Sequence, residues 1–281
     1  MDCRTNLELR IKMENYQLEK KATEFRKKIM EVGYQTKSGH LSSALSCTDI
    51  MVALYYGGFL NYNKGSYLNT DRNRFILSKG HACIIQYLIL VDLGLISNEE
   101  LLKLCKPGSI LGAHPDSLKI PGIEATTGAL GHGLSISIGY ALGAKYNEQN
   151  YQVYTILGDG ECEEGSVWEA ALCAGHQKLD NLTVIIDYNK LQASDYTFNI
   201  TTLDSLVEKW FDFGFNTCEI DGNNMEEVMK ALQKPMDKKP KAIVAHTIKG
   251  KGVNIIENQN NWHGRKPNDK EWFLIRKQMG I

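Results

Sequence analysis

Short apolar segments rich in β-branched residues alternate along the chain with longer segments of helical periodicity. The apolar segments predict strands at 74–77, 153–157, 182–186 and 242–245, with a further extended segment at 215–220. The periodic segments predict helices at 6–37, 48–57, 81–93, 97–105, 132–148, 164–178, 202–214 and 223–233. Strands that are apolar throughout and separated by helices are typical of a parallel sheet buried on both faces. The predicted fold is therefore α/β: a doubly wound, mainly parallel sheet with helices on both faces.

The composition narrows the class of protein. The 32 Lys and Arg residues nearly balance 33 Asp and Glu residues, so the net charge of −1 does not favour a nucleic acid or an acidic membrane as partner. No apolar stretch reaches the roughly 18 residues of a membrane-spanning helix, and residues 1–28 lack the apolar region of a signal peptide. The seven cysteines form no C-x-x-C pair, which is typical of reduced thiols. We therefore expect a cytoplasmic protein with no nucleic-acid and no membrane partner.

The chain shows no internal repeat and no stretch with the composition of a linker. Its turn-rich segments, 61–73, 107–122 and 254–269, lie between periodic segments and are typical of functional loops. We therefore expect a single domain over residues 1–281.

The strand at 153–157 leads into Gly158-Asp159-Gly160-Glu161 and then into a helix. Glycines let the backbone approach an anion, and a helix N-terminus offers free N–H groups, so this turn favours a phosphate. The acidic side chains of Asp159, Glu161, Glu163 and Glu164 would repel a bare anion. A divalent cation between carboxylate and phosphate resolves this conflict.

The next strand, 182–186, is followed by Asp187-Tyr188-Asn189-Lys190-Leu191. Ligands of such folds bind beyond the carboxyl ends of the strands, where Asn189 is expected to lie near Asp159. Oxygen atoms of these two side chains and of a backbone carbonyl are suited to Mg²⁺. The alternative for Gly158-Asp159-Gly160 alone is an ordinary turn, with Asp159 capping the following helix. The dinucleotide-binding pattern G-x-G-x-x-G is absent, which disfavours a nicotinamide enzyme.

With this pair of motifs the chain resembles the thiamine diphosphate enzymes, and among them transketolase. The signature of these enzymes is Gly-Asp-Gly followed by a closing Asn, here Asn189. Further transketolase-like motifs follow the family's order over nearly the whole chain. They are Ser38-Gly39-His40, Leu77-Ser78-Lys79-Gly80-His81-Ala82, Gly112-Ala113-His114-Pro115-Asp116, Thr126-Thr127-Gly128-Ala129-Leu130-Gly131-His132-Gly133, Thr247-Ile248-Lys249-Gly250-Lys251-Gly252 and Asn261-Trp262-His263-Gly264.

The resemblance implies thiamine diphosphate as cofactor, bound through Mg²⁺ or Ca²⁺, and a role for each matching residue. The metal ligands would be Asp159, Asn189 and the carbonyl of Leu191. The cofactor-binding residues would be Ser43, His81, Gly128, Leu130, Asp159, Gly160, Asn189, Lys249 and His263. Gly160 N–H, His81 and Lys249 would meet the diphosphate. Gly128 and Leu130 would pack under the cofactor, with the Gly128 carbonyl facing the aminopyrimidine. The alternatives are a helix-terminal histidine for His81 and a solvated lysine for Lys249.

The resemblance also implies that His40, His114 and His263 are the catalytic residues. Histidine titrates near neutral pH, which suits proton movements at the hydroxyls of a ketose. Leu41 and Ser42 stand where the family usually has Gly or Pro, so we expect the mouth of the donor site to differ. Glu164 matches a glutamate near the family's subunit interface, or is an exposed glutamate in the first turn of a helix.

Transketolases transfer a two-carbon ketol unit between sugar phosphates, and their longer chains contain a diphosphate-binding, a pyrimidine-binding and a C-terminal domain. The resemblance covers only the first. It implies the N-terminal subunit of a two-chain transketolase, whose activating glutamate lies on a partner chain with the pyrimidine-binding domain. Two copies of each chain, an α2β2 assembly, and sugar or sugar-phosphate substrates are expected. The alternatives are half of a 1-deoxyxylulose-phosphate-synthase-like enzyme, or a non-catalytic scaffold with the same fold.

Overall fold

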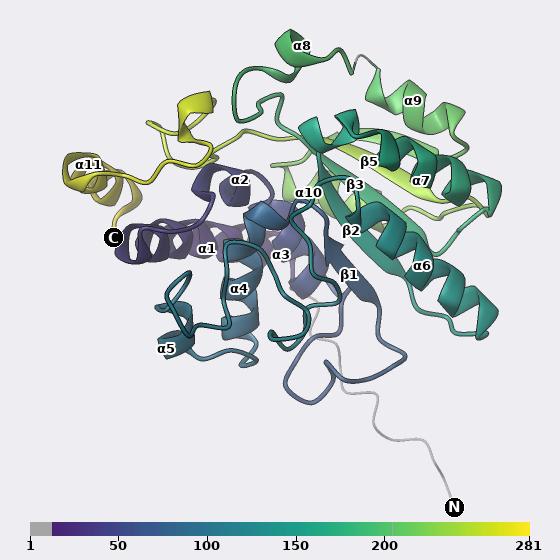
Figure 1. Ribbon diagram of the computed structural model, residues 1–281, viewed down its shortest axis with the longest axis horizontal. Helices are drawn as coiled ribbons and strands as arrows, with labels where there is room; N and C mark the ends of the chain where they lie inside the picture. The colour runs from purple at the N-terminus through teal and green to yellow at the C-terminus, as the bar shows by residue number, and fades with distance from the viewer. Residues whose placement is uncertain (1–12, 204) are drawn as a thin grey trace, which may run out of the picture.

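A parallel sheet forms the centre of the computed structural model, which describes residues 13–203 and 205–281. Its five strands follow the order β1-β2-β3-β5-β4, and every neighbouring pair is parallel (Figure 1). The strands are β1 (Arg74–Leu77), β2 (Val153–Gly158), β3 (Leu182–Tyr188), β4 (Asn216–Asp221) and β5 (Lys241–His246). The prediction of a doubly wound parallel sheet is therefore confirmed.

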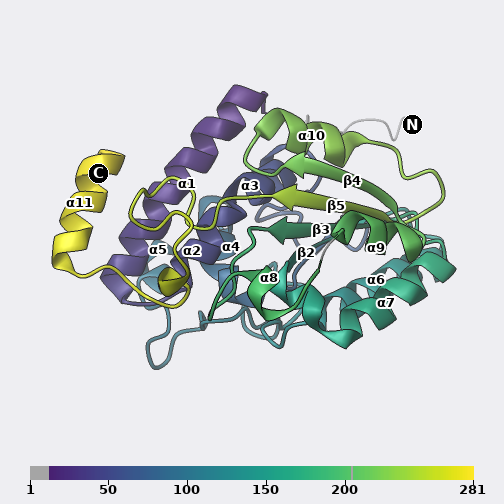
Figure 2. The same cartoon turned by 90° about the horizontal axis from the view of Figure 1, so that it is seen from above.

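Helices cover both faces of this sheet. The α-helices are α1 (Asn15–Thr36), α2 (Leu41–Ser46), α3 (Thr48–Tyr56), α4 (Cys83–Asp92), α5 (Asn98–Leu101), α6 (Gly133–Tyr146), α7 (Gly165–His176), α8 (Thr197–Ile200), α9 (Leu206–Asp212), α10 (Met225–Gln233) and α11 (Asp269–Met279). The 3-10 turns are η1 (Gly80–Ala82), η2 (Gly160–Glu163) and η3 (Asn260–Trp262). Figure 2 shows α1, α3 and α10 on one side of the sheet, with α6 and α7 on the other.

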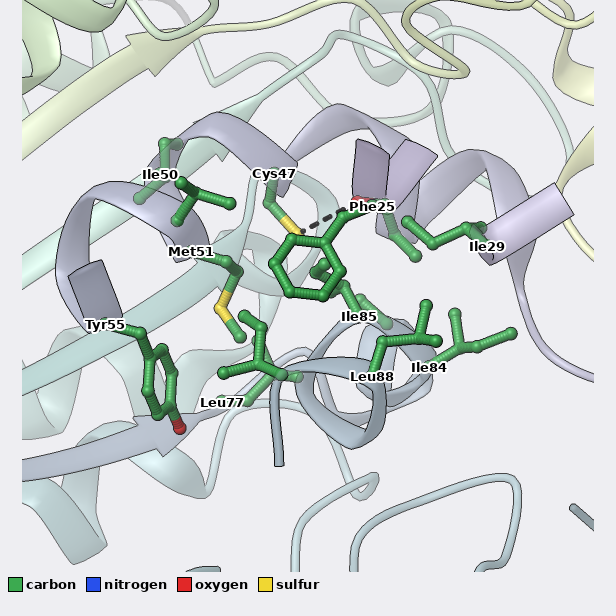
Figure 3. Close-up of a cluster of buried hydrophobic side chains, with 14 of the residues drawn as sticks. Phe25, Ile29, Cys47, Ile50, Met51, Tyr55, Leu77, Ile84, Ile85 and Leu88 are labelled. Atoms are coloured by element: carbon green, nitrogen blue, oxygen red, sulfur yellow. Dashed lines mark hydrogen bonds between the residues drawn. The ribbon is translucent and has the colours of Figure 1, made fainter. Parts of the chain in front are cut away.

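Alternate residues of β1, β2, β3 and β5 enter two hydrophobic cores, because successive side chains of a strand point to opposite faces. Ile156 and Ile185 pack into the core formed with α1, α3 and α4. Figure 3 shows part of this core, where Phe25 of α1 faces side chains of α3 and α4. Leu157 and Ile186 pack on the other face, with α6, α7 and α9. Because both faces are buried, a ligand can reach the sheet only at the ends of its strands.

Several predicted helices are shorter in the structure. The helix predicted at 97–105 is only α5, after which the chain turns through Cys105 with φ of +59°. Ser97 caps α5 by accepting a hydrogen bond from Glu100 N at 3.2 Å. The Glu100 carboxylate instead accepts hydrogen bonds from Ser109 and Ile110 in the following loop, each at 2.8 Å. Because the loop engages the Glu100 carboxylate, Ser97 and Glu100 do not form a capping box, although their spacing is typical of one.

Other boundaries also differ. The helix predicted at 6–37 is α1 from Asn15, and residues 6–12 lie outside the described residues. The helix predicted at 202–214 is reduced to α9, and residue 204 likewise lies outside the described part. The helices α2, α8 and α11 were not predicted. For α11 a signal existed, because Asn268 and Glu271 form a complete capping box. No described helix combines the length and apolar composition needed to cross a bilayer.

Candidate cofactor site

A cavity of about 380 Å³ lies beyond the carboxyl ends of β2 and β3. It is lined by every residue predicted for cofactor binding, metal binding or catalysis: His40, Ser43, His81, His114, Gly128, Leu130, Asp159, Gly160, Asn189, Leu191, Lys249 and His263. These residues come from segments far apart in the sequence, and the fold brings all of them to one place. Their separate roles in cofactor binding, metal binding and catalysis stay predictions.

Asp159 follows β2 directly and is buried. Its Oδ1 accepts a hydrogen bond from Gly160 N at 2.8 Å, and its Oδ2 accepts one from the backbone N–H of Lys190. Burial, together with the neighbouring carboxylate of Asp187, raises the pKa of Asp159 to about 6. Because a nearby cation would stabilise the charged form of such a carboxylate, this position favours a positive ion.

Two further oxygen atoms lie on the segment after β3. The side chain of Asn189 is buried and its Oδ1 accepts a hydrogen bond from Leu191 N at 3.1 Å. The carbonyl oxygen of Leu191 accepts a hydrogen bond from Lys249 Nζ at 2.6 Å. This carbonyl therefore faces a position that accommodates a cation.

Carboxylate, amide and carbonyl oxygens are the ligands that hard divalent cations such as Mg²⁺ and Ca²⁺ prefer. Asp159, Asn189 and the Leu191 carbonyl supply one of each kind at the cavity wall. Within the described residues, no group of three or more His, Cys, Asp or Glu side chains is placed to hold a metal. The residues present therefore fit a hard divalent cation that is bound by one carboxylate, one amide oxygen and one backbone carbonyl oxygen.

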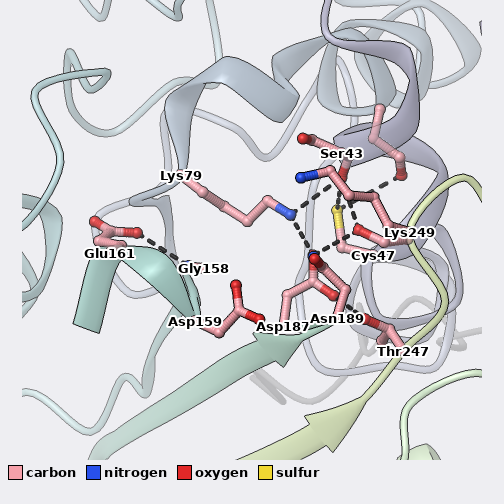
Figure 4. Close-up of polar contacts among 12 residues, drawn as sticks. Ser43, Cys47, Lys79, Gly158, Asp159, Glu161, Asp187, Asn189, Thr247 and Lys249 are labelled. Atoms are coloured by element: carbon pink, nitrogen blue, oxygen red, sulfur yellow. Dashed lines mark hydrogen bonds and ion pairs between the residues drawn. The ribbon is translucent and has the colours of Figure 1, made fainter. Parts of the chain in front are cut away.

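Lys79, which lines the cavity, forms a buried ion pair with Asp187 (Figure 4). The side chains are 2% and 0% exposed, so neither charge is screened by solvent. Lys79 Nζ also donates to the carbonyl oxygen of Ser43 at 3.1 Å, and Asp187 accepts a hydrogen bond from the hydroxyl of Ser46 at 2.6 Å. Burial is the largest single effect and lowers the pKa of Lys79, but Asp187, Cys47 and Asp159 together outweigh it and raise the pKa to about 12. Lys79 therefore stays charged, and the pair ties β1 and α2 to the end of β3.

Glu161 joins three loops at the opposite wall. Its buried carboxylate accepts hydrogen bonds from Gly131 N at 3.0 Å and Gly158 N at 3.1 Å, and another from the hydroxyl of Ser78. Burial raises the pKa of Glu161. These hydrogen bonds fix three segments relative to one another around the cavity: the end of β1, the glycine-rich segment before α6 and the turn after β2.

Gly128 is one of the positions where only glycine fits. Its φ is +131°, and a Cβ atom there would lie 2.6 Å from the His114 ring. Residue types with a side chain rarely adopt this φ, and the contact would displace the histidine. The glycine in the sequence motif is therefore explained by the close approach of the 126–133 segment to His114.

Four histidine rings gather beside the proposed metal ligands and Lys249. His40 lies with its ring centroid 5.3 Å from that of His81, 5.4 Å from that of His263 and 6.3 Å from that of His114. Lys249 Nζ lies 3.0 Å from His263 Nδ1, so the cluster contacts the lysine predicted to meet the diphosphate. The three predicted catalytic histidines and His81 thus form one group.

Burial and neighbouring cations lower the pKa of three of these rings, those of His40, His81 and His263, and so keep them neutral. Burial, followed by Lys249, lowers the pKa of His263 to about 3. Burial, followed by Lys79, lowers the pKa of His81 well below its ordinary value. Burial also lowers the pKa of His40. For Lys249 itself burial is the main cause of a pKa lowered to about 8, which Asp159 partly opposes. Neutral imidazoles can accept protons from substrate hydroxyls at neutral pH.

The roles of Lys79, Asp187 and Glu161 were not predicted from the sequence. The available signal was the position of charged residues directly after apolar strands, where they are buried by the fold. Glu164 lies exposed on the cavity rim as the N-cap residue of α7. Its exposure in this chain fits both alternatives considered for it, an interface glutamate and a solvated one.

Comparisons with known proteins agree with this site. The sequence profile of the family described as transketolase, thiamine diphosphate binding domain, matches residues 19–281. The chain is 39% identical over 257 residues to one of the subunits of apulose-4-phosphate transketolase from Phocaeicola vulgatus, covering 91% of each chain. It is 37% identical over 257 residues to 6-deoxy-6-sulfo-D-fructose transketolase subunit SqwG of a Clostridium species, covering 91% of this chain and 93% of that protein.

Solved transketolases share the fold but are much longer. The structure matches transketolase of Campylobacter jejuni with a TM-score of 0.87 at 28% identity, covering 96% of this chain and 43% of that one. It matches transketolase of Leishmania mexicana with a TM-score of 0.84 at 30% identity, covering 94% of this chain and 41% of that one. The chain thus spans about two fifths of the length of these solved enzymes. With its cavity residues in the order and place that the motifs require, the chain belongs to the transketolase family, within which it matches the thiamine diphosphate-binding domain.

Proposed function

We propose that the chain is the diphosphate- and metal-binding subunit of a two-chain transketolase. The enzyme would transfer a two-carbon ketol unit between a ketose and an aldose, or their phosphates, with thiamine diphosphate. The observation that carries the proposal is the single cavity that gathers the metal-type oxygens, Lys249 and the histidine cluster. The lengths of the relatives also support the proposal, because the chain spans about nine tenths of two proteins that are named as transketolase subunits.

In this proposal Asp159, Asn189 and the Leu191 carbonyl hold Mg²⁺ or Ca²⁺. Thiamine diphosphate, when bound, supplies the carbanion and the electron sink that ketol transfer requires. Lys249 and the N–H of Gly160 bind its diphosphate, as a cation and a backbone donor bind phosphates elsewhere. His81 lies in the same wall, within reach of the diphosphate.

His40, His114 and His263 then bind the hydroxyls of the sugar. As neutral rings, His40 and His263 accept a hydroxyl proton while the carbon–carbon bond breaks, and return it when the new bond forms. Their arrangement around His40 lets several hydroxyls be held at once, which orients the sugar.

A partner chain completes the site in this proposal. By motif, none of the chain's carboxylates matches the family's activating glutamate, which lies on the pyrimidine-binding domain. The partner would supply that domain, and two copies of each chain would form an α2β2 assembly. The donor and acceptor sugars depend on residues of both chains.

Ketol transfer should be measured with thiamine diphosphate and Mg²⁺, using this chain alone and mixed with a candidate partner that carries a pyrimidine-binding domain. We expect activity only in the mixture. Asp159→Ala should abolish it by removing a metal ligand. Asp180→Ala is the matched control, because Asp180 forms an exposed ion pair with Lys145 and lies outside the cavity.

The outcomes separate the alternatives. Activity of the chain alone would overturn the two-chain proposal. Activity of the mixture with a 2-oxo acid and an aldose phosphate, with release of CO₂ and no ketol transfer, would show the condensing alternative. Absence of both activities together with no calorimetric binding of thiamine diphosphate would favour a scaffold.

A further inference from the structure

Ser42 connects two of the predicted catalytic histidines without belonging to the described lining of the cavity. It is the second residue of α2, whose N-cap residue is His40, and it is fully buried. Its Oγ donates a hydrogen bond to the carbonyl oxygen of the buried Trp262 at 3.0 Å. Because Trp262 directly precedes His263, this hydrogen bond joins the segment that carries His40 to the segment that carries His263.

The backbone of Ser42 holds a third segment. Its carbonyl oxygen accepts a hydrogen bond from Gly250 N at 3.0 Å. Gly250 follows Lys249, whose Nζ lies 3.0 Å from Nδ1 of His263. The contacts therefore form a closed cycle, which runs from Ser42 through residues 262–263 and 249–250 back to Ser42. In such a cycle no segment can shift without stretching or breaking a contact with the others.

The two segments that Ser42 contacts differ in their other restraints. Gly250 has φ of +81°, and a Cβ atom there would lie 2.6 Å from the side chain of Ile256. Next to Lys249, the backbone N–H of Ile248 donates a hydrogen bond to Oδ1 of Asn223 at 2.9 Å. The Lys249 segment is thus fixed by contacts that do not involve the Ser42 hydroxyl.

The His263 segment depends on that hydroxyl more strongly. The backbone N–H of His263 donates within its own turn, to the carbonyl oxygen of Asn260 at 3.0 Å, which does not fix the turn against α2. The hydrogen bond from Ser42 to the Trp262 carbonyl does so. A buried acceptor that loses its donor is unfavourable, so the turn would relax away from α2 if the hydroxyl were removed.

This relation bears on the distance between two rings. The ring centroids of His40 and His263 lie 5.4 Å apart. His40 is two residues before Ser42, and His263 is one residue after Trp262, so the hydrogen bond is the short connection between them. Groups that act on one substrate must keep their relative positions, because a misplacement of about 1 Å can lower the rate about 100-fold.

We propose that Ser42 is a positioning residue, whose hydroxyl sets the separation of His40 and His263 on the substrate side of the cavity. It acts through the two rings and not on the substrate itself. The inference rests on the proposed function, since the separation matters only if both rings hold one sugar. The segment of Lys249 is held by the backbone of Ser42 and does not need the hydroxyl.

The first test measures ketol transfer by the complex of this chain with its partner, per site that binds thiamine diphosphate. In Ser42→Ala we expect kcat to fall about 10- to 100-fold, with the KM for the donor within about 3-fold. The Kd for thiamine diphosphate should stay within about 2-fold, because alanine keeps the carbonyl that holds Gly250. An unchanged kcat would overturn the inference.

Ser137→Ala is the matched control. Ser137 is also fully buried, and its hydroxyl donates to the carbonyl oxygen of Gly133 at 2.7 Å, within α6 and outside the cavity lining. This variant loses the same kind of hydrogen bond and should keep the kcat of the wild type.

A double variant separates positioning from a general effect on the fold. If Ser42 acts through the spacing of the two rings, its hydroxyl has no further effect once His263 is replaced. The kcat of Ser42→Ala combined with His263→Gln should therefore equal that of His263→Gln within about 2-fold. An equal loss on both backgrounds would show that Ser42 acts elsewhere, which contradicts the inference.

A spectroscopic measurement does not depend on activity. The histidine ring signals of the chain alone are followed by NMR, with His263 assigned by His263→Gln. Ser42→Ala should shift the signal of His263 and leave that of the exposed His176 in place, and Ser137→Ala should shift neither. If the complex transfers no ketol unit to any acceptor, the proposed function fails. The His263 signal still decides the role of Ser42, because an unshifted signal in Ser42→Ala would refute it.

Discussion

The ammonium nitrogen of Lys249 lies 2.6 Å from the carbonyl oxygen of Leu191, one of the three proposed metal ligands. The same nitrogen lies 3.0 Å from His263 Nδ1. Lys249 therefore links the proposed metal position to the histidine cluster, and its buried charge is positioned for an anion that bridges the two.

Replacing this lysine should separate cofactor binding from metal binding. In Lys249→Met we expect the Kd for thiamine diphosphate to rise at least about 10-fold, or about 1.4 kcal/mol, because the diphosphate loses a buried cation. Affinity for the metal alone should not fall, since Lys249 no longer occupies a lone pair of the Leu191 carbonyl. Calorimetry measures both. Lys251→Met, in the same loop but outside the cavity lining, should leave the Kd unchanged; an unchanged Kd in Lys249→Met would contradict the assignment.

The buried histidines should make the chain sensitive to acid. The pKa of His263 is about 3 in the folded chain, lowered mainly by burial, against the ordinary value of 6.5. The unfolded chain therefore binds a proton below pH 6.5 that the folded chain does not bind until about pH 3. This residue consequently makes the free energy of unfolding decrease as the pH falls through that window.

Urea unfolding at a series of pH values tests this. In His263→Gln the free energy of unfolding should decrease less steeply between pH 6.5 and the lowest pH at which the chain remains folded. His176→Gln, an exposed position at the end of α7, should keep the slope of the wild type. Identical slopes in all three proteins would mean that His263 titrates normally.

Gly128→Ala should damage the site through geometry alone. A Cβ atom at this position would lie 2.6 Å from the His114 ring, and φ of +131° is strained for alanine. We expect ketol transfer by the complex to fall at least about 100-fold, because misplaced reacting groups lose rate on that scale. Gly139→Ala is the control. Its Cβ would meet nothing within 4 Å on the exposed side of α6, so it should stabilise the helix by roughly 0.5–1 kcal/mol. Full activity of Gly128→Ala would refute the geometric argument.

The Lys79–Asp187 pair should stabilise the fold far more than an exposed ion pair. Lys79→Met leaves a buried carboxylate without its cation, and we expect a loss of about 3–5 kcal/mol in the free energy of unfolding. Adding Asp187→Asn should recover part of that loss, which a double-mutant cycle would record as a coupling above about 1 kcal/mol. The same cycle on Lys145 and Asp180, whose side chains are 40% and 39% exposed, should give a coupling below about 1 kcal/mol. Equal couplings for the two pairs would contradict this reasoning.

The central strands were predictable because they are apolar throughout and flanked by turn residues. The predicted strand 74–77 coincides with β1, and the predicted strand 153–157 differs from β2 by one residue. The short helices were not predictable in the same way. The four residues of α8 are held by tertiary contacts, among them the hydrogen bond from Thr197 N to the carbonyl oxygen of Lys190 at 3.0 Å and the bridge between Leu191 and Tyr196 just before the helix. Such contacts leave no periodic pattern in the sequence.

The cavity residues were predictable because their motifs demand special residue types, such as Gly128 beside His114. Lys79, Asp187 and Glu161 were missed because a lysine or carboxylate is usually solvated, and only the three-dimensional fold shows that these are buried.

The hydrogen bond between Ser42 and Trp262 joins positions 220 residues apart. During synthesis on the ribosome, the N-terminal side of the cavity therefore emerges long before the loop that carries His263. The described sheet has all its strands by β5, but the substrate side of the pocket closes only after the later segment around His263 has emerged. A nascent chain would thus present its diphosphate-binding turn first and gain the means to hold a sugar last.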